Sequence, residues 1–358
     1  MNVPLLVSTD KGLYVPLGDF YIDPIRRVPR AVITHAHSDH ARRGSGAYLC
    51  SVPTEPLLRG RLGNISVQSL SWGEKITIGE VQVSFHPAGH ILGSAQIRLE
   101  YRGYVMLVTG DFKYDADPTA ESWEAVRAHA VLSECTFGLP VYRWPDPRGV
   151  IAEIAAWWEA CQRKNHRAIF LAYSLGKAQR ILASLPDLGP RYVHLSVVRM
   201  NEAYEAQGIQ LGRWQPLPRD GRIEPGAFIL LPPQVKIERL QAFAPYEVAE
   251  ASGWLLLRKH RRSSSLHQAF VLSDHADFYQ LIRCLEATGA ESFYFTHGYR
   301  EAMQTYFAAK GYASYVWPDR YADRRTLFSG EGAPEPDGPA GGPSPYLAHG
   351  EPPFAGAP

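Results

Sequence analysis

The chain has 358 residues, a formal net charge of +1 and 45% hydrophobic residues, enough to bury a large core, and its length predicts two domains. The balanced charge excludes a strongly basic field, so any nucleic-acid partner has to be bound by local patches. Four scattered cysteines without paired spacing argue against a disulfide framework and a cysteine zinc site: Cys50, Cys135, Cys161 and Cys284.

The chain also carries no sign of a membrane segment. No stretch approaches the roughly 18 unbroken apolar residues of a membrane span. The first residues lack the charged start and long apolar stretch of a signal peptide. We therefore expect a cytoplasmic protein without a membrane partner.

The first 140 residues have the pattern of short strands separated by glycine and proline. Apolar and polar residues partly alternate, as in half-buried strands, in segments 67–70, 75–78, 81–86 and 96–101. Segments 104–108 and 130–132 are continuous apolar runs, which is typical of buried central strands.

The pattern changes after residue 140. Apolar residues recur at helical spacing in 149–163, where Trp157 and Trp158 fit the core-facing stripe rather than a base-stacking surface. Two further helices are predicted at 176–185 and 278–288, and strands are predicted at 168–172, 192–197, 228–231, 268–272 and 292–295. Strands that alternate with helices predict an inserted α/β domain with a parallel sheet.

The densest group of potential metal ligands lies between residues 35 and 40, after the apolar run 31–33. His35 and His37 are two positions apart, so an extended chain places them on one side. Asp39 and His40 follow where the chain must turn. Mixed nitrogen and oxygen ligands suit zinc, with manganese or iron as alternatives. A pair of divalent ions sharing this segment is suited to in-line attack on phosphate esters.

The remaining candidate ligands share one placement, near the end of a predicted core strand: His90, Asp111, Glu134, His275 and His297. Polar residues in this position converge at one edge of a sheet. Each alone also fits an ordinary turn, but together they supply the further ligands that two metals need.

Two groups of these residues resemble a known family. The first is similar in order to the ligand set of the metallo-β-lactamase superfamily: His35, His37, Asp39, His40, His90 and Asp111. The second is similar to the three extra motifs of the superfamily's nucleic-acid-processing branch, the β-CASP nucleases: Glu134, His275 and His297. The resemblance covers about residues 1–330.

The resemblance implies an α/β fold, the αββα sandwich of metallo-β-lactamases with an inserted α/β β-CASP domain. The first part of the metallo-β-lactamase domain would span 1–140, the inserted domain 141–266 and the return segment 267–329. Residues 330–358, rich in proline, glycine and alanine, would form a disordered tail with no part in catalysis.

The resemblance also implies roles for the ligands. One metal would be held by His35, His37 and His90, and the other by Asp39, His40 and His297. Asp111 would bridge both metals, and a hydroxide between them would attack the phosphorus.

Three further residues take supporting roles in the same pattern. Asp23 would orient a ligand histidine from behind. His275, with Glu134 as its partner, would assist the leaving oxygen, either as a general acid or by holding the scissile phosphate.

Short segments indicate one part of the family. Residues 110–113, 132–138 and 172–177 are similar to segments of the DNA cross-link-repair nucleases, which typically lack the last histidine. This chain has His297, as the RNA-processing members do. The mixture is most like the bacterial exonucleases encoded beside a DNA ligase and a helicase, to which segments 12–24 and 88–96 are also similar.

Two segments are candidate contacts for substrate phosphate. Ser174, Gly176 and Lys177 follow a predicted strand and open a helix, where backbone N–H groups can bind an anion. Arg258 and Arg261 belong to the densest basic run, which can bind a nucleic-acid backbone. The structural alternatives are a plain strand–helix turn and a solvated basic surface.

These observations predict a metal-dependent DNA exonuclease, 5′-end-directed, acting on DNA ends or single strands in repair alongside a ligase and a helicase. Its cofactors would be two divalent metal ions, zinc first and manganese second. An RNA-processing nuclease with the same site is the nearest alternative. Two further alternatives have less support from the residues: a small-molecule ester or lactone hydrolase, and an inactive scaffold that binds DNA ends.

Overall fold

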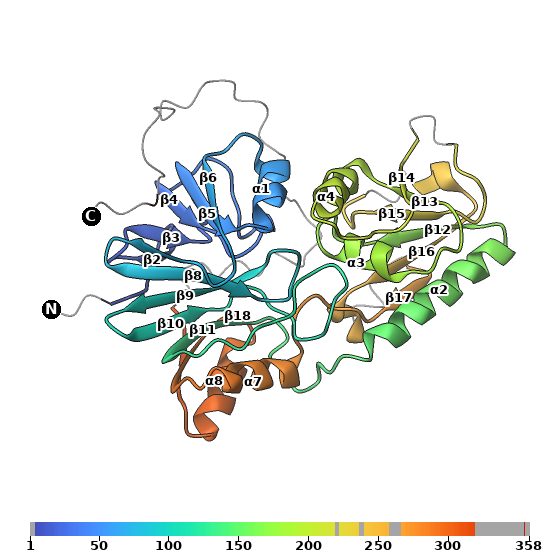
Figure 1. Cartoon of the computed structure of the whole chain (residues 1–358). Coiled ribbons are helices and arrows are strands. Elements are labelled where there is room, and N and C mark those ends of the chain that lie inside the picture. The colour runs from blue at the N-terminus through green and yellow to red at the C-terminus, as the bar shows by residue number, and fades with distance from the viewer. Residues whose placement is uncertain (1–3, 219–221, 236–239, 258–265, 319–353, 355–358) are drawn as a thin grey trace.

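Three β-sheets organise the chain (Figure 1), and the computed structural model describes residues 4–218, 222–235, 240–257, 266–318 and 354. The first sheet contains, in spatial order, β1 (Val7–Thr9), β2 (Gly12–Val15), β3 (Phe20–Ile22), β4 (Arg30–Val32), β5 (Ala47–Ser51) and β6 (Val67–Leu70). The second contains β19 (Ala313–Val316), β18 (Ser292–Gly298), β11 (Ala130–Cys135), β10 (Tyr104–Val108), β9 (Ala95–Tyr101), β8 (Val81–Pro87) and β7 (Lys75–Ile78).

The first two sheets pack face to face. Their inner faces share one apolar cluster, to which Phe20, Leu49, Phe85 and Leu132 contribute fully buried side chains. Helices α7 (Phe278–Ala287) and α8 (Arg300–Ala309) cover the outer face of the second sheet, and α1 (Thr54–Leu62) lies on the outer face of the first (Figure 1). The predicted αββα sandwich is confirmed.

The third sheet is parallel throughout its described pairings, as predicted for the inserted α/β domain. Its strands are, in spatial order, β14 (Gln215–Pro216), β13 (Arg191–Val193), β15 (Phe228–Leu231), β12 (Arg167–Leu171), β16 (Tyr246–Ala251) and β17 (Gln268–Phe270). Helices α2 (Pro147–Arg163), α3 (Lys177–Ser184) and α4 (Leu195–Glu205) share an apolar cluster with one of its faces. The same cluster includes Ile33 and Leu57 of the sandwich, so the two parts share a core.

Several elements depart from the prediction. The strand predicted at 192–197 ends at Val193, because the His194 side chain accepts a hydrogen bond from the Ser196 amide and caps α4. The strand predicted at 268–272 ends at Phe270 and pairs with β16, so the segment 267–329 begins inside the third sheet. The limits of the inserted domain therefore remain a prediction.

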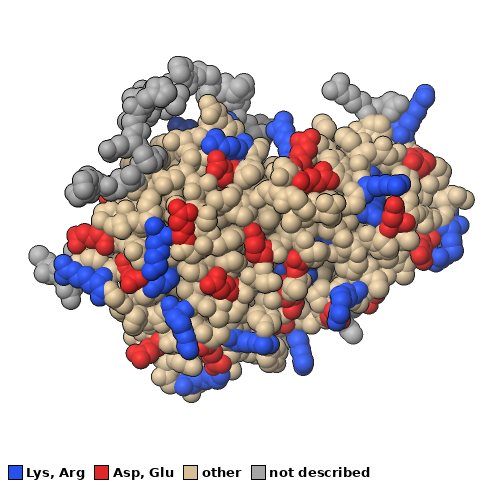
Figure 2. All heavy atoms as spheres, viewed as in Figure 1, with Lys and Arg blue, Asp and Glu red and all other residues tan. Residues whose placement is uncertain are grey.

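The predicted tail 330–358 lies outside the described residues except for Phe354, which is buried in the cluster between the first two sheets. No helix in the described part of the chain has the length and apolarity to cross a membrane. Lysine and arginine are interspersed with aspartate and glutamate on the face drawn in Figure 2, in keeping with the net charge of +1.

Helix α2 forms where its sequence predicts it. Asp146 caps its first turn by accepting from the Arg148 amide, Pro147 occupies the first helical position, and one face is buried. Trp158 is fully buried, and its indole N–H donates to the Gly226 main-chain oxygen at 2.8 Å. The prediction that Trp158 is a core residue is confirmed.

Replacing the Trp158 side chain tests the packing of α2. Trp158→Ala is expected to lower the free energy of unfolding by about 3–5 kcal/mol, because it leaves a cavity and an unpaired carbonyl. Urea unfolding followed by circular dichroism measures the change. Glu153→Ala, on the exposed face of the same helix, is the control and should stay within about 0.5 kcal/mol of the wild type. A loss of that small size for Trp158→Ala would contradict the packing.

Candidate metal centre

Three imidazole nitrogens lie together at the edge of the sandwich. Nδ1 of His37 is 3.1 Å from Nε2 of His35 and 3.1 Å from Nε2 of His90. A tetrahedral zinc ion with bonds of about 2.0–2.1 Å separates neighbouring nitrogens by about 3.3 Å. The three nitrogens are therefore spaced as ligands of one ion would be.

Asp111 completes this group from the end of β10. Its Oδ2 lies 3.7 Å from Nε2 of His35, 3.7 Å from Nε2 of His90 and 3.4 Å from Nε2 of His40. His35, His37, His90 and Asp111 form a cluster that can bind a metal ion. Nitrogen and carboxylate oxygen donors at these separations fit a divalent ion such as zinc.

In each of the three histidines, the outer ring nitrogen, which points away from the cluster, has its own hydrogen-bond partner. His37 Nε2 donates to the Leu175 main-chain oxygen at 3.1 Å, and His90 Nδ1 donates to that of Asp274 at 2.6 Å. His35 Nδ1 lies 3.1 Å from the Thr34 hydroxyl. Because a carbonyl only accepts, the proton of His37 and His90 sits on the outer nitrogen and the inner nitrogen keeps its lone pair.

Burial keeps the three rings neutral. It is the main cause that lowers the pKa of His37, and it lowers the pKa of His35 and His90 well below the usual value. Asp111 responds in the opposite sense: burial raises its pKa, but His40 and His275 outweigh this and hold the pKa well below its usual range. Neutral imidazoles and an ionised carboxylate are the forms that bind metals.

The group predicted for a second metal is more open. Nε2 of His40 lies 3.8 Å from Oδ2 of Asp39, whose side chain is 73% exposed. The His297 ring centre lies 6.4 Å from that of His40, against 4.8–4.9 Å for the rings that share the first cluster. His297 therefore stands at the rim of the centre, beside His40 rather than within the compact cluster.

His297 reaches this place through an irregularity in β18. Glu134 pairs with Thr296 and Cys135 with Gly298, so His297 is an extra residue in its strand and has a φ of 57°. Gly298 follows with a φ of 72°, and a Cβ there would lie 2.2 Å from the Cys135 oxygen. Only glycine fits that position, so the bulge depends on the His297-Gly298 pair.

Asp23 supports the centre from behind. Its carboxylate accepts from the Thr34 amide at 2.8 Å and from His40 Nδ1 at 2.7 Å, which turns His40 Nε2 toward Asp111. Burial opposes protonation of His40, but Asp111 and Asp23 raise its pKa well above the usual value. A cation bound at Nε2 therefore has to displace a proton.

Removing the Asp23 carboxylate should weaken metal binding. Asp23→Asn is expected to reduce Zn²⁺ affinity about 10- to 100-fold, because the orientation and basicity of His40 are lost. Competition against a chromophoric chelator measures this affinity. Asp10→Asn, which alters an exposed carboxylate on the same part of the chain, should leave it unchanged. Equal affinity in both variants would contradict the supporting role of Asp23.

Glu134 and His275 form a pair beside the cluster. His275 Nδ1 lies 2.9 and 3.1 Å from the two carboxylate oxygens of Glu134, which also accepts from the Phe112 amide at 2.9 Å. Asp111, Glu134 and His275 form the second group of close ligand atoms among the described residues. Burial lowers the pKa of His275, but Glu134 and Asp111 outweigh it and raise the pKa to about 9. The ring is thus cationic near neutral pH, with Nε2 free of the Glu134 contact.

The predicted phosphate contacts differ in burial and in their hydrogen-bond partners. Lys177 is buried, and its ammonium group donates to the Leu272 main-chain oxygen at 2.7 Å and lies 3.1 Å from Asp274. The Gly176 amide donates to the Gln179 side chain at 2.8 Å. Internal partners therefore occupy both groups in this structure, and phosphate binding by Lys177 and the Gly176 amide stays a prediction. Ser174 remains at the surface, 2.7 Å from the Ser196 hydroxyl, and Arg258 and Arg261 lie outside the described residues.

Two contributors to the centre are not identified by the sequence motifs. The main-chain oxygens of Leu175 and Asp274 fix His37 and His90, but a carbonyl leaves no residue-type signal. Asp274 directly precedes His275 in the sequence, and this position is the signal that could have identified Asp274.

Comparison with known proteins identifies relatives, although no family model matches the chain. A probable DNA ligase of Opitutus terrae is 32% identical over 303 residues, which are 83% of this chain and 29% of that protein. A transcription termination factor FttA of Lokiarchaeum is 27% identical over 46% of this chain and 31% of that protein. An endoribonuclease YSH1 of Gibberella zeae is 25% identical over 34% of this chain and 15% of that protein. The chain spans less than a third of the length of each of these curated relatives.

A solved structure supports the fold. The crystal structure of a protein of unknown function from Enterococcus faecalis V583 matches with a TM-score of 0.58 and 13% identity, over 81% of this chain and 79% of that one. One family accounts for the sandwich, the parallel inserted sheet, the His/Asp cluster and the named relatives. The chain belongs to the metallo-β-lactamase superfamily and to its β-CASP branch.

Proposed function

We propose that the chain is a metal-dependent nuclease that hydrolyses phosphodiester bonds at DNA ends, as a 5′-end-directed exonuclease. The observation that carries the proposal is the Glu134–His275 pair, 2.9 Å apart and grouped with Asp111 at the edge of the metal cluster. A cationic imidazole beside a metal cluster suits a reaction in which an anionic phosphodiester is cleaved and an oxygen leaves.

The residues fit two divalent ions, with zinc as the first choice and manganese as the second. His35, His37 and His90 would hold one, and His40, Asp39 and His297 would contribute to the other. When bound, such ions act as Lewis acids on the phosphate and lower the pKa of the attacking water. Asp111 lies between the two groups of ligands, within 3.4–3.7 Å of three histidine nitrogens.

His275 would act on the leaving side of the substrate. Glu134 holds Nδ1, so Nε2 is the atom that can donate a proton to the leaving oxygen or hydrogen-bond to the phosphate. Glu134 is itself fixed by the Phe112 amide and the Thr136 hydroxyl, which keeps the pair in one orientation.

The choice of DNA rests on the similarity to the probable DNA ligase. In the probable DNA ligase of Opitutus terrae, a segment similar to 83% of this chain belongs to a protein named for strand joining. Sealing requires trimmed ends with the correct chemistry, so an end-directed nuclease suits a partner of that kind. We therefore infer a place in DNA repair next to a ligase.

RNA processing is the second candidate, and it has its own support. The transcription termination factor FttA and the endoribonuclease YSH1 are also similar to this chain, at 27% and 25% identity. Both candidates use the same site, so they differ in substrate and not in the chemistry assigned to its residues.

Matched strands separate the candidates. DNA and RNA of one sequence, labelled at either end and carrying a 5′-phosphate or 5′-hydroxyl, are incubated with the protein in Zn²⁺ or Mn²⁺. We expect stepwise loss of nucleotides from the 5′ end of DNA. Faster cleavage of RNA would favour the second candidate. No cleavage of either polymer by metal-loaded protein would overturn the proposal, and turnover of an ester or lactone would then indicate a small-molecule hydrolase.

A further inference from the structure

A network of buried charges joins α3 to the metal centre. Its five side chains are only 1–9% exposed: Lys113, Asp117, Lys177, Arg180 and Asp274. Lys113 and Asp117 follow the metal ligand Asp111, Lys177 and Arg180 lie on α3, and Asp274 precedes His275. The network therefore connects three separate segments of the chain, two of which carry residues of the centre.

Helix α3 binds the main chain of 272–274 through both of its cations. Arg180 Nη1 donates to the Ser273 main-chain oxygen at 2.7 Å and to Oδ1 of Asp274 at 3.0 Å. Lys177 donates to the Leu272 oxygen at 2.7 Å and pairs with Oδ2 of Asp274 at 3.1 Å. On its other side, Arg180 Nε lies 3.3 Å from Asp117, which also pairs with Lys113.

These contacts end on the metal ligands. The main-chain oxygen of Asp274 accepts from His90 Nδ1 at 2.6 Å, and the next residue is His275. The turn before α3 provides the Leu175 oxygen that accepts from His37 Nε2. Residues 175–180 thus hold the outer atoms of His37 and, through 272–274, of His90.

Stability alone is a weak explanation for such a network. Burying charged side chains has a desolvation cost that their mutual attraction barely offsets, and apolar replacements are often as stable. The network holds three cations and two anions, so one cation exceeds what charge balance requires. The excess is understandable if each α3 cation is needed for its own main-chain acceptor, Leu272 for Lys177 and Ser273 for Arg180.

We propose that Lys177 and Arg180 are positioning residues of the metal centre, which set the orientation of His90 and His275 by fixing the main chain of residues 272–274. Helix α3 of the inserted domain is therefore one wall of the metal site. The inference rests on the proposed metal centre but is independent of the nucleic acid that is cut.

Metal affinity tests this directly. Lys177→Met and Arg180→Met each remove one cation and leave two cations facing the two anions of the network. Each is expected to bind Zn²⁺ about 10- to 100-fold more weakly in competition with a chromophoric chelator, as for other residues that orient metal ligands. Circular dichroism and thermal unfolding verify the fold of each variant. Wild-type Zn²⁺ affinity in a folded variant would overturn the proposal, and a change confined to the KM for DNA would assign phosphate binding instead.

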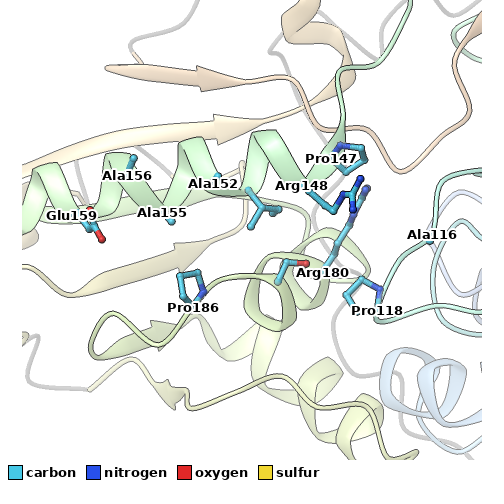
Figure 3. A pocket seen from close by; sticks show the side chains of 12 residues that line it. Ala116, Pro118, Pro147, Arg148, Ala152, Ala155, Ala156, Glu159, Arg180 and Pro186 are labelled. Carbon is cyan, nitrogen blue, oxygen red and sulfur yellow. The ribbon is translucent and has the colours of Figure 1, made fainter.

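The chain offers a matched control for the arginine. Arg148 and Arg180 line the same groove of about 560 Å³ between α2, α3 and residues 116–118 (Figure 3). The Arg148 side chain is 92% exposed and pairs with Asp146, which is not part of the network, so Arg148→Met should retain wild-type Zn²⁺ affinity. Arg180→Lys, which keeps the charge but not the fork of donors, should recover part of the affinity lost in Arg180→Met.

A measurement on the wild-type protein needs no variant to fold. Because α3 and 272–274 are joined to His37 and His90, Zn²⁺ binding should slow hydrogen exchange of the α3 amides together with those of 272–276. The amides near the end of α2, around Arg163, are the internal reference and should not change. If Zn²⁺ slows exchange at 272–276 but leaves exchange in α3 unchanged, the helix is not coupled to the centre, and this result would overturn the proposal.

Discussion

Asp111→Asn is expected to lower phosphodiester cleavage on the order of 10³-fold or more. Oδ2 of Asp111 lies within 3.4–3.7 Å of nitrogens from His35, His40 and His90. The amide keeps the size of the side chain but removes the negative charge that both groups of ligands share. Initial rates on end-labelled DNA measure the loss, and metal analysis of the same sample is expected to show fewer bound ions.

The control lies on the same loop. Asp115→Asn changes a half-buried carboxylate four positions further on, outside the clusters of ligand atoms, and should cleave at close to the wild-type rate. Both variants have to be purified free of metal and then reloaded in the same way, so that the two samples differ only in the substituted residue. Substantial cleavage by Asp111→Asn prepared in this way would contradict the assigned chemistry.

The sequence predicts the centre well because its residues occupy the ends of strands. An alternating pattern predicts β8 and apolar runs predict β10 and β11. The polar residues that follow or end these segments are His90, Asp111 and Glu134. The strands lie close together in one sheet, so the ends meet at one edge whatever the details of packing. The order of residues in the chain is enough to predict this placement.

What the sequence cannot predict depends on contacts between distant segments. Lys177 follows a strand and opens a helix, the pattern of an anion-binding turn, but Leu272 and Asp274 fold over it and use its ammonium group. His297 looks like an ordinary strand-end residue, yet a bulge with a positive φ sets its direction. The sequence predicts a strand and not α4 at 192–197, because Leu195-Ser-Val-Val fits a strand as well as a helix and only the His194 cap decides between them.

The second large effect concerns His275. His275→Ala is expected to reduce cleavage about 10²- to 10⁴-fold while the bound metal stays near the wild-type level, because Nε2 of this ring serves the substrate. Initial rates and metal analysis on one sample measure the two quantities. Loss of metal in parallel with activity would contradict this role and make His275 a ligand.

The pH dependence of the Glu134→Gln variant follows from the same pair. Glu134, together with Asp111, raises the pKa of His275 to about 9, so the acidic form persists through neutral pH and is lost as the pH rises through that value. Without the Glu134 carboxylate, less opposes the effect of burial, so the pKa of His275 falls and the acidic form is lost at lower pH. The alkaline limb of kcat/KM, measured from about pH 6 to about pH 10, should therefore move to lower pH. An unmoved limb would mean that another group controls it.

An activated substrate separates the two roles open to His275. A p-nitrophenyl ester of thymidine 5′-monophosphate releases a leaving group that needs no proton, so His275→Ala should cleave it at nearly the wild-type rate if Nε2 is a general acid. If Nε2 instead holds the phosphate, the loss persists with this ester, because the charge on the phosphate is the same in both substrates. Undiminished cleavage of natural DNA by the variant would contradict both roles, and the Glu134–His275 pair would then be a structural contact between β11 and the loop after β17.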